Sequence, residues 1–492
     1  MKNVDTHAGA PDAYTTVPPL NPDRPRNRRI FLTGATGAWG RMALAHLRDA
    51  GLDVVALVLP TPGDRAVIEQ QRWPGLTIVE GDLTDPAPVA RCVADVDVVL
   101  HVGAMVSPLA DTNPGLTRRV NIGSMRNIVD AVAALPDPGS VAVIGIGSVA
   151  ETGSRNPPVH WGRIGDPVRV SQFDEYGQTK VAAERILVDS GLPRWTWLRQ
   201  TGILHPGMLA IRDPIMTHPP FEAVMEWVSD ADAARLLVGL CQPDVPEELW
   251  GHIWNIGGGE NWRLTNWEFQ VAIGGSLGVR DVRRWYDRSW FATRNFHGQW
   301  YTDSDALNDL VPFRTEMFAD ALARVHALQS FAVRNAGRVP SWIIKKYVMG
   351  PQTRAPRGTM HAIETGHEEG IRAHFGSREA WEAIGGWDDF VVPNPSRTPA
   401  YLDHGYDESK PETAWTHADL VGAATFRGGS PVTPPATSRT PTTWRCADGH
   451  TFEASPFLVL RGGHWCPTCV QRSGDYDRQA ETNAFLAQVL VG

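Results

Sequence analysis

Tyr176 and Lys180 have the spacing of a proton-transfer pair. They stand four residues apart in Tyr176-Gly177-Gln178-Thr179-Lys180, and residues i and i+4 lie on one face of a helix. A lysine ammonium beside a phenol favours the phenolate, so we expect Lys180 to lower the pKa of Tyr176 toward working pH. The pair therefore indicates a general acid/base at a substrate oxygen.

A glycine-rich turn far upstream suits a pyrophosphate. Thr33-Gly34-Ala35-Thr36-Gly37-Ala38-Trp39-Gly40 follows the strand-like Arg29–Leu32. Where side chains are missing, backbone N–H groups and a helix N-terminus can approach the phosphates. The GxxGxxG spacing and the Tyr-x-x-x-Lys spacing are each weak signals alone, but together they predict hydride transfer with a nicotinamide cofactor.

Alternating strand and helix patterns must position these two motifs. Apolar strand patterns occur at Arg29–Leu32, Val54–Leu59, Thr77–Asp82, Val96–His101, Val141–Ile146 and Trp195–Arg199. Helical patterns lie between them at Arg41–Ala50, Val120–Ala134 and Tyr176–Ser190. This alternation predicts an α/β fold with a parallel sheet and helices on both faces. Ligands bind beyond the carboxyl ends of such strands, which is where the motifs fall.

The chain here resembles the extended short-chain dehydrogenase/reductases, which include the NAD-dependent epimerase/dehydratases. The resemblance covers about residues 28–330, and its motifs occur in the family's order. They are the Thr33–Gly40 turn, Gly81-Asp82-Leu83-Thr84, His101-Val102-Gly103-Ala104, Val120–Ser124, Gly147-Ser148 and Tyr176–Lys180. The resemblance implies a Rossmann-type doubly wound parallel sheet with a smaller α/β substrate lobe.

The resemblance also implies catalytic roles. Tyr176 is the acid/base, and Lys180 assists it and holds the nicotinamide ribose. Ser148 hydrogen-bonds the reacting oxygen, and Asn121 supports the lysine. Two alternatives stay open: Ser148 as a plain strand end, and Asn121 as a helix N-cap.

The implied cofactor contacts follow the same order along the chain. They are Gly34, Thr36, Gly37, Ala38, Trp39, Gly40, Arg65, Asp82, Leu83, Gly103, Ala104, Lys180, Gln200 and Ile203. Asp82 is alternatively an acid of a turn. Gln200 stands where many members of the family have proline, which departs from the family pattern.

The choice between NAD and NADP depends on charge. A carboxylate at the end of the second strand would bind the ribose 2′-OH of NAD and repel a 2′-phosphate. This strand ends in Leu57-Val58-Leu59-Pro60 without an acid, and Arg65 follows. We therefore expect NADP(H) to be preferred over NAD(H); the alternative is that Arg65 is only a solvated charge.

The active residues narrow the reaction. Sugar dehydratases of this family place acids directly after the active hydroxyl residue, whereas this chain has Ser148-Val149-Ala150. We expect an NAD(P)-dependent oxidoreductase that interconverts a carbonyl and an alcohol on a small organic, apolar or aromatic substrate. One alternative is an NAD-retaining epimerase acting through a transient ketone, for example on a sugar nucleotide. The other is a non-catalytic, dinucleotide-sensing regulatory protein.

A compact Cys/His pattern near the C-terminus predicts a structural zinc ion. Cys446-x3-His450 is followed by Cys466-x2-Cys469. Two ligand pairs on tight turns can close a tetrahedral site with no open position, and the pattern resembles zinc-ribbon and treble-clef modules. His464 is the alternative fourth ligand.

Changes in composition along the sequence divide the chain into predicted domains and segments. We expect a disordered tail at 1–27, the dehydrogenase domain at 28–330, a mostly helical or irregular extension at 331–428, a linker at 429–443, the zinc module at 444–473 and a C-terminal helix at 474–492. The net charge of −9 opposes a nucleic-acid partner. No apolar run has the length of a membrane span, so we expect no membrane partner. The cysteine usage suggests the cytoplasm, and the family resemblance suggests a homodimer through the helices that carry Asn121 and Tyr176.

Overall fold

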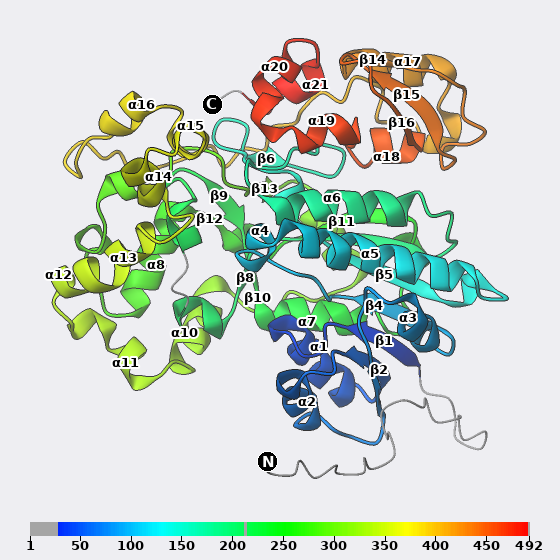
Figure 1. The fold of residues 1–492 in the computed structure, drawn as a ribbon, viewed down its shortest axis with the longest axis horizontal. Helices are drawn as coiled ribbons and strands as arrows, with labels where there is room; N and C mark the ends of the chain where they lie inside the picture. Colours follow the sequence, from blue (N-terminus) through cyan, green and yellow to red (C-terminus); the bar gives the residue numbers. More distant parts are fainter. Residues whose placement is uncertain (1–27, 211–213, 491–492) are drawn as a thin grey trace, which may run out of the picture.

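The computed structural model of the chain describes residues 28–210 and 214–490 (Figure 1). The tail expected at 1–27 lies outside the described residues. A seven-stranded sheet with the order β11-β7-β5-β4-β1-β2-β3 forms its centre, and every neighbouring pair is parallel. The strands are β1 Arg29–Thr33, β2 Asp53–Val58, β3 Leu76–Glu80, β4 Val98–His101, β5 Ala142–Ser148, β7 Trp195–Gln200 and β11 His252–Ile256.

Helices cover both faces because neighbouring residues of each strand point to opposite sides. On β1, Ile30 and Leu32 pack into the core beneath α1 and α7, while Phe31 packs into the core beneath α3, α5 and α6. These helices are α1 Ala38–Asp49, α7 Asp230–Gly239, α3 Pro86–Val93, α5 Pro114–Ala133 and α6 Glu175–Val188, with the shorter α2 Pro62–Glu69 and α4 Leu109–Thr112 between them. The doubly wound Rossmann-type sheet is therefore confirmed.

A smaller α/β lobe is formed mostly by residues that follow β7, together with β6. It holds short strand pairs: β6 Trp161–Gly162 with β13 Trp300–Tyr301, β8 Ile203–Leu204 with β10 Val228–Ser229, and β9 Val224–Glu226 with β12 Arg263–Thr265. Its helices are α8 Asn266–Ser276, α9 Ser304–Leu310 and α10 Phe318–Ala327. The extension continues with α11 Phe331–Arg334, α12 Ser341–Ile344, a π-helical turn Lys345–Met349, α13 Gly350–Thr353, α14 Thr359–Thr365, α15 Glu368–Phe375, α16 Arg378–Glu382 and α17 His417–Phe426.

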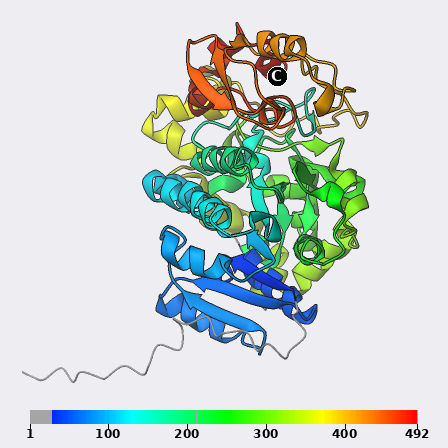
Figure 2. The same cartoon turned by 90° about the vertical axis from the view of Figure 1, so that its right-hand side faces the viewer.

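The C-terminal module, drawn at the top of the molecule in Figure 1 and Figure 2, packs against α6. It contains the three-stranded antiparallel sheet β14 Gly429–Pro431, β15 Thr442–Cys446 and β16 Thr451–Ala454. The helices α18 Pro456–Leu460, α19 Pro467–Gln471, α20 Tyr476–Ala480 and α21 Ala484–Ala487 complete it.

Two sequence expectations about this region are wrong. The segment 429–443 is not only a linker, because Gly429–Pro431 pairs with β15. The C-terminal helix at 474–492 is instead two short helices, since the Asn483 side chain accepts a hydrogen bond from Leu486 N and starts a new helix. Among the described residues, no helix has the length and hydropathy needed to cross a bilayer.

Candidate active site

Ser148, Tyr176 and Lys180 meet where β5 ends against α6. Asp174 caps α6 by accepting a hydrogen bond from Gly177 N at 2.7 Å, which places Tyr176 in the first turn and Lys180 in the next. The Tyr176 and Ser148 side chains are hydrogen-bonded to each other. Lys180 Nζ donates to Ile146 O at 2.7 Å and lies 5.7 Å from the centre of the Tyr176 ring.

Protonation in this cluster differs from the expectation. Burial raises the pKa of Tyr176 above its ordinary value of 10; the Ser148 hydrogen bond opposes this rise, and the nearby carboxyl groups of Glu151 and Asp174 add to it. Burial also lowers the pKa of Lys180 to about 8. The expected lowering of the Tyr176 pKa is therefore absent here, because the Lys180 ammonium points to the Ile146 carbonyl and the phenol is enclosed.

Asn121 connects two loops of the site. Its Oδ1 accepts from Met105 N at 2.8 Å, and its Nδ2 donates to Met105 O and to Thr179 Oγ1, each at 2.9 Å. The N-cap alternative is wrong, because α5 begins at Pro114 and Asn113 caps it. Asn121 thus holds the loop after β4 against the helix turn that carries Lys180.

The glycine turn has the open shape that a dinucleotide phosphate needs. Gly34 has φ +71°, and a Cβ there would lie 2.6 Å from Gly103 Cα. A Cβ on Gly40 would lie 1.9 Å from Gly34 O. No side chain caps the N-terminus of α1 at Gly37, so the N–H groups at its start can bind an anion. The turn, which also carries Thr36, Ala38 and Trp39, fits the group predicted for it.

Asp82 and Leu83, which the sequence predicts as contacts to the adenosine half of the dinucleotide, also contact neighbouring residues of the protein. Asp82 Oδ1 accepts from Thr84 N at 2.8 Å and from Thr84 Oγ1 at 2.9 Å, as an acid of a turn does. The Leu83 side chain lies over Gly103, where an added Cβ would be 3.1 Å from Leu83 Cδ1. Gly103 N donates to Thr33 Oγ1 at 2.9 Å, which brings Gly103-Ala104 beside the glycine turn.

The sequence prediction missed an acid at this end of the site. Thr36 Oγ1 donates to Asp64 Oδ1 at 2.6 Å, so a carboxylate lies against the glycine turn. Arg65, the predicted cation, donates through Nη2 to Glu80 Oε2 at 2.7 Å. Asp64 lies beyond the strand end in the first turn of α2, where a search limited to the last strand residues could not find it.

A cavity of about 650 Å³ opens at Ser148. Its wall is mostly apolar and comes from the lobe and the extension, with Met225, Trp227, Phe269, Trp285 and Met349 among the lining residues. Gln200 and Thr201 line the end nearest Ser148, and Gln200 Oε1 is buried with no hydrogen-bond partner in the described structure. Such an unpaired acceptor fits a carboxamide or another donor group. Ile203 begins β8 beside it and pairs with Val228.

Cys446, His450, Cys466 and Cys469 converge, with all four ligand atoms within 4.8 Å of one another. The Sγ atoms of Cys446 and Cys469 are 3.8 Å apart, and Cys469 Sγ lies 3.5 Å from His450 Nδ1. Tetrahedral Zn²⁺ with Zn–S of about 2.3 Å places its sulfur ligands at roughly this separation. The set is therefore compatible with zinc. His464 is not a ligand, because its Nε2 lies 2.8 Å from Glu184 Oε1.

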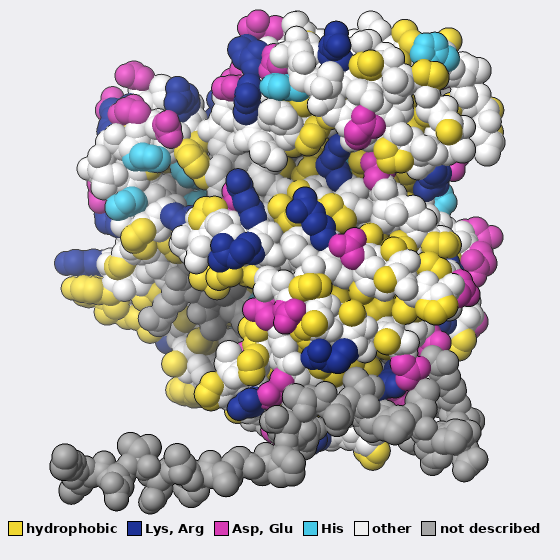
Figure 3. All heavy atoms as spheres, turned by 45° about the vertical axis from the view of Figure 1, so that its right-hand side comes forward, with side chains coloured by type: hydrophobic (Ala, Val, Ile, Leu, Met, Phe, Trp, Pro, Cys, Tyr) yellow, Lys and Arg dark blue, Asp and Glu magenta, His cyan; other side chains and the backbone are white. Residues whose placement is uncertain are grey.

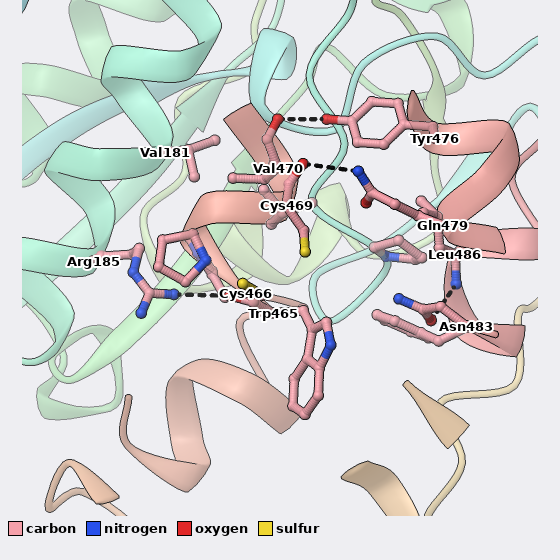
Figure 4. A pocket seen from close by; sticks show the side chains of 16 residues that line it. Val181, Arg185, Trp465, Cys466, Cys469, Val470, Tyr476, Gln479, Asn483 and Leu486 are labelled. Carbon is pink, nitrogen blue, oxygen red and sulfur yellow. Dashed lines mark hydrogen bonds between the residues drawn. The ribbon is translucent and has the colours of Figure 1, made fainter. Parts of the chain in front are cut away.

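The module is docked on α6. Figure 4 shows Val181 and Arg185 of α6 facing Cys466 and Trp465, and Arg185 Nη1 donates to Trp465 O at 3.2 Å. At the far end of the helix, Ser455 Oγ donates to Asp189 Oδ1 at 2.6 Å. One continuous core contains Trp195 and Leu187 together with Phe457 and Leu458 of the module.

A fully buried polar network runs from the module to Ser148. Arg199 of β7 donates to Glu184 Oε1 at 2.7 Å and to Gly462 O at 2.8 Å. Its Nε lies 3.6 Å from Glu151 Oε2, and Glu151 Oε1 accepts from Ser148 N at 2.7 Å. Burial and then the neighbouring Glu184 carboxylate raise the pKa of Glu151, and Glu184 is the carboxylate that lies closest to the Arg199 guanidinium, at 2.7 Å.

Part of the chain resembles known proteins. Residues 30–192 match the model of the NAD dependent epimerase/dehydratase family. The human 3 beta-hydroxysteroid dehydrogenase type 7 is 27% identical over 186 residues, which cover 33% of this chain and 50% of that protein. D-erythronate dehydrogenase of Cupriavidus necator is 31% identical over 113 residues, 23% of this chain and 33% of that protein.

The match to the solved structure of a dTDP-glucose 4,6-dehydratase from Bacillus anthracis, in complex with NAD, covers 64% of this chain and 98% of the dehydratase chain. The sequence identity is 15% and the TM-score is 0.48. The chain spans half or less of the length of the curated relatives it matches.

Proposed function

We propose that the chain, whose residues 30–192 match the NAD dependent epimerase/dehydratase family, is an NAD(P)-dependent oxidoreductase that interconverts a carbonyl and an alcohol on an apolar organic substrate. One observation carries the proposal: the hydrogen-bonded Ser148–Tyr176 pair lies at the end of a largely apolar cavity that Ser148 lines. The dinucleotide, when bound, supplies or accepts the hydride.

In the proposed reaction, side chains of the protein transfer the proton and orient the reacting oxygen of the substrate. Burial keeps Tyr176 protonated, which suits a donor to a carbonyl oxygen as it becomes an alkoxide. Ser148 Oγ is in place to hydrogen-bond the same oxygen. The Lys180 ammonium is held at the Ile146 carbonyl, where the family resemblance places it against the nicotinamide ribose. Asn121, through Thr179, holds the helix turn that carries Lys180.

The cavity supports the choice of substrate class. Its wall is formed by aliphatic, methionine and aromatic side chains from the lobe and the extension. Apolar ligands gain roughly 25 cal/mol for each Å² that leaves water, so such a wall selects a hydrophobic body with a single oxygen placed at Ser148. The matched protein named 3 beta-hydroxysteroid dehydrogenase type 7 is named for a substrate of this character.

The remaining parts of the proposal concern cofactor, metal and partners. The sequence favours NADP(H) over NAD(H) through Arg65, whereas the carboxylate of Asp64 beside the glycine turn favours a 2′-OH. The zinc ion is structural, because four protein ligands leave no open position. We also propose a cytoplasmic location and a homodimer through α5 and α6; light scattering of the purified chain tests the dimer.

The first experiment separates the reductase from its alternatives. The protein is purified gently, and the released small molecules are identified by mass. An empty protein that binds NADPH or NADH reversibly is the expected result. Stoichiometric NAD that survives purification would favour the epimerase instead. If neither dinucleotide is found or binds, the oxidoreductase proposal is overturned.

Substitution of Tyr176 separates the enzyme from a dinucleotide sensor. Tyr176→Phe removes the proton donor but leaves the glycine turn intact, so turnover of the carbonyl substrates found by screening should fall by about 10²-fold or more while dinucleotide affinity is kept. The matched control is Tyr401→Phe, an exposed tyrosine far along the chain. Full activity in Tyr176→Phe would contradict the assigned chemistry.

A further inference from the structure

The extension exposes large apolar side chains in one short stretch. Leu328, Phe331, Trp342 and Tyr347 are each more than 60% exposed, and Val339 is 37% exposed. Leu328 follows the end of α10, and Val339 precedes α12. The others lie in α11, in α12 and in the π-helical turn that follows. We name residues 328–347 the apolar lip. Exposed apolar groups scattered singly are ordinary, but five within one segment mark an interaction surface.

The lip is also cationic. Arg334, Arg338, Lys345 and Lys346 lie within it, and residues 328–349 contain no aspartate or glutamate. Lys345 pairs with Asp287 at 2.6 Å, while Arg334, Arg338 and Lys346 are exposed. Figure 3 shows basic and hydrophobic side chains side by side on the projecting edge where α12 lies in Figure 1.

The same segment forms part of the cavity wall. Ala332, Val333, Ala336, Ile344 and Val348 line the cavity that opens at Ser148. Residues next to them in the chain, such as Phe331 and Tyr347, face solvent. The apolar lip therefore separates the apolar interior of the site from the outside by a single layer of short helices.

We propose that the apolar lip docks on the surface of an anionic lipid bilayer, from which an apolar substrate enters the cavity. Aromatic and leucine side chains beside arginine and lysine are the composition of segments that lie in the membrane interface. Basic residues next to such a segment are attracted to anionic headgroups. Entry of substrate rests on the proposed function; docking itself does not.

The expectation of no membrane partner rested on the absence of a membrane-spanning run. A segment that lies in the interface needs no such run, because only its exposed side chains enter the headgroup region. A protein partner would need acidic groups and a matching apolar face, whereas a bilayer with anionic lipids supplies both without a fixed shape. The uniform positive sign of the lip favours the bilayer.

Vesicle co-sedimentation tests docking on the full chain without cofactor or substrate. The probes are phosphatidylcholine vesicles with and without phosphatidylserine. We expect binding to the mixed vesicles that weakens as salt is added, because the charges at the surface are screened. The double variant Phe331→Ser/Trp342→Ser should lower the partition constant by about tenfold or more through lost apolar burial. Arg338→Glu/Lys346→Glu should remove the preference for phosphatidylserine.

The control is Val391→Ser/Tyr401→Ser, which removes two apolar side chains that are 82% and 65% exposed outside the lip; it should bind vesicles as the unaltered chain does. All the substituted side chains are exposed, so unchanged melting temperatures verify that every variant is folded. Equal binding by the lip variants and the control would overturn the proposal, as would no binding by the unaltered chain. If the unaltered chain is a dimer and the lip variants are monomers, the apolar lip binds a second copy of the chain instead. Loss of dinucleotide binding, by contrast, overturns only the proposed function.

Discussion

At the scale of single residues, Lys180 stands out because burial of its charge costs stability. Burial lowers its pKa from 10.5 to about 8. Below pH 8, Lys180 is protonated in both the folded and the unfolded protein, so the full cost of burying the charge is present. Between pH 8 and 10.5 the folded protein loses the proton and this cost becomes smaller. Above pH 10.5 the lysine is neutral in both states and the cost is absent. Lys180→Met should therefore raise the free energy of unfolding at neutral pH by about 1–2 kcal/mol, after allowing for the lost hydrogen bond to Ile146.

Denaturant unfolding at two pH values checks this expectation. The increase in the free energy of unfolding caused by Lys180→Met should be clear at pH 7. It should become smaller as the pH rises toward 10.5, the ordinary pKa of lysine. Lys346→Met, at an exposed position, is the control and should change stability little at either pH. An equal gain at both pH values would mean that the burial of charge is not its source.

We expect the residues Asp64 and Arg65 to determine whether the chain prefers NADPH or NADH. The Asp64 carboxylate is held at the glycine turn by Thr36, where it would repel a 2′-phosphate, while Arg65 would attract one. Asp64→Ser should shift the ratio of NADPH to NADH affinity toward NADPH by about tenfold, and Arg65→Ser should shift it toward NADH. Fluorescence titration with both dinucleotides measures the ratio. Asp305→Ser, an exposed acid in the lobe, should leave it unchanged.

At the scale of elements, the four candidate zinc ligands bring β15 and α19 together. Cys446 ends β15, and Cys469 lies within α19, so the ion would join a strand to a helix. Cys446→Ser should remove the bound zinc, measured by elemental analysis of the purified chain, and should expose the module to proteolysis before the sheet, because metal binding supplies folding free energy in small modules. Cys92→Ser, at a buried cysteine of α3, should keep the zinc. Zinc retained at full stoichiometry by Cys446→Ser would contradict the ligand assignment.

The sequence allowed the central elements to be predicted because their signals are local. The strand expected at Trp195–Arg199 is β7 Trp195–Gln200, and the helix expected at Tyr176–Ser190 is α6 Glu175–Val188. The linker expected at 429–443 was wrong because Gly429–Pro431 becomes a strand only through pairing with β15, which no local composition reveals. The lowered pKa expected for Tyr176 failed for a related reason, since burial and the direction of Lys180 are properties of the folded chain.

At the scale of the whole molecule, the sheet and the module form one unit. His464 and Glu184 are 280 residues apart in sequence and 2.8 Å apart in space. Neither carries a local signal, so only the fold shows that the module contacts the network beneath Ser148. Because buried charged groups that lose a partner cost several kcal/mol, the network couples the position of Ser148 to the docking of the module.

Hydrogen exchange can detect this coupling directly. His464→Ala should leave Glu184 without one partner and loosen the Glu184–Arg199–Glu151 contacts. Exchange of the Ser148 amide should then speed up by about tenfold or more, since that N–H is held by the Glu151 side chain. His464→Gln keeps a donor near Glu184 and should restore protection. The control, Ser455→Ala, removes a docking bond to Asp189 outside the network and should lower the stability of the module without changing exchange at Ser148. If Ser455→Ala and His464→Ala speed that amide equally, the effect comes from docking in general. The buried polar network would then have no special part in holding Ser148.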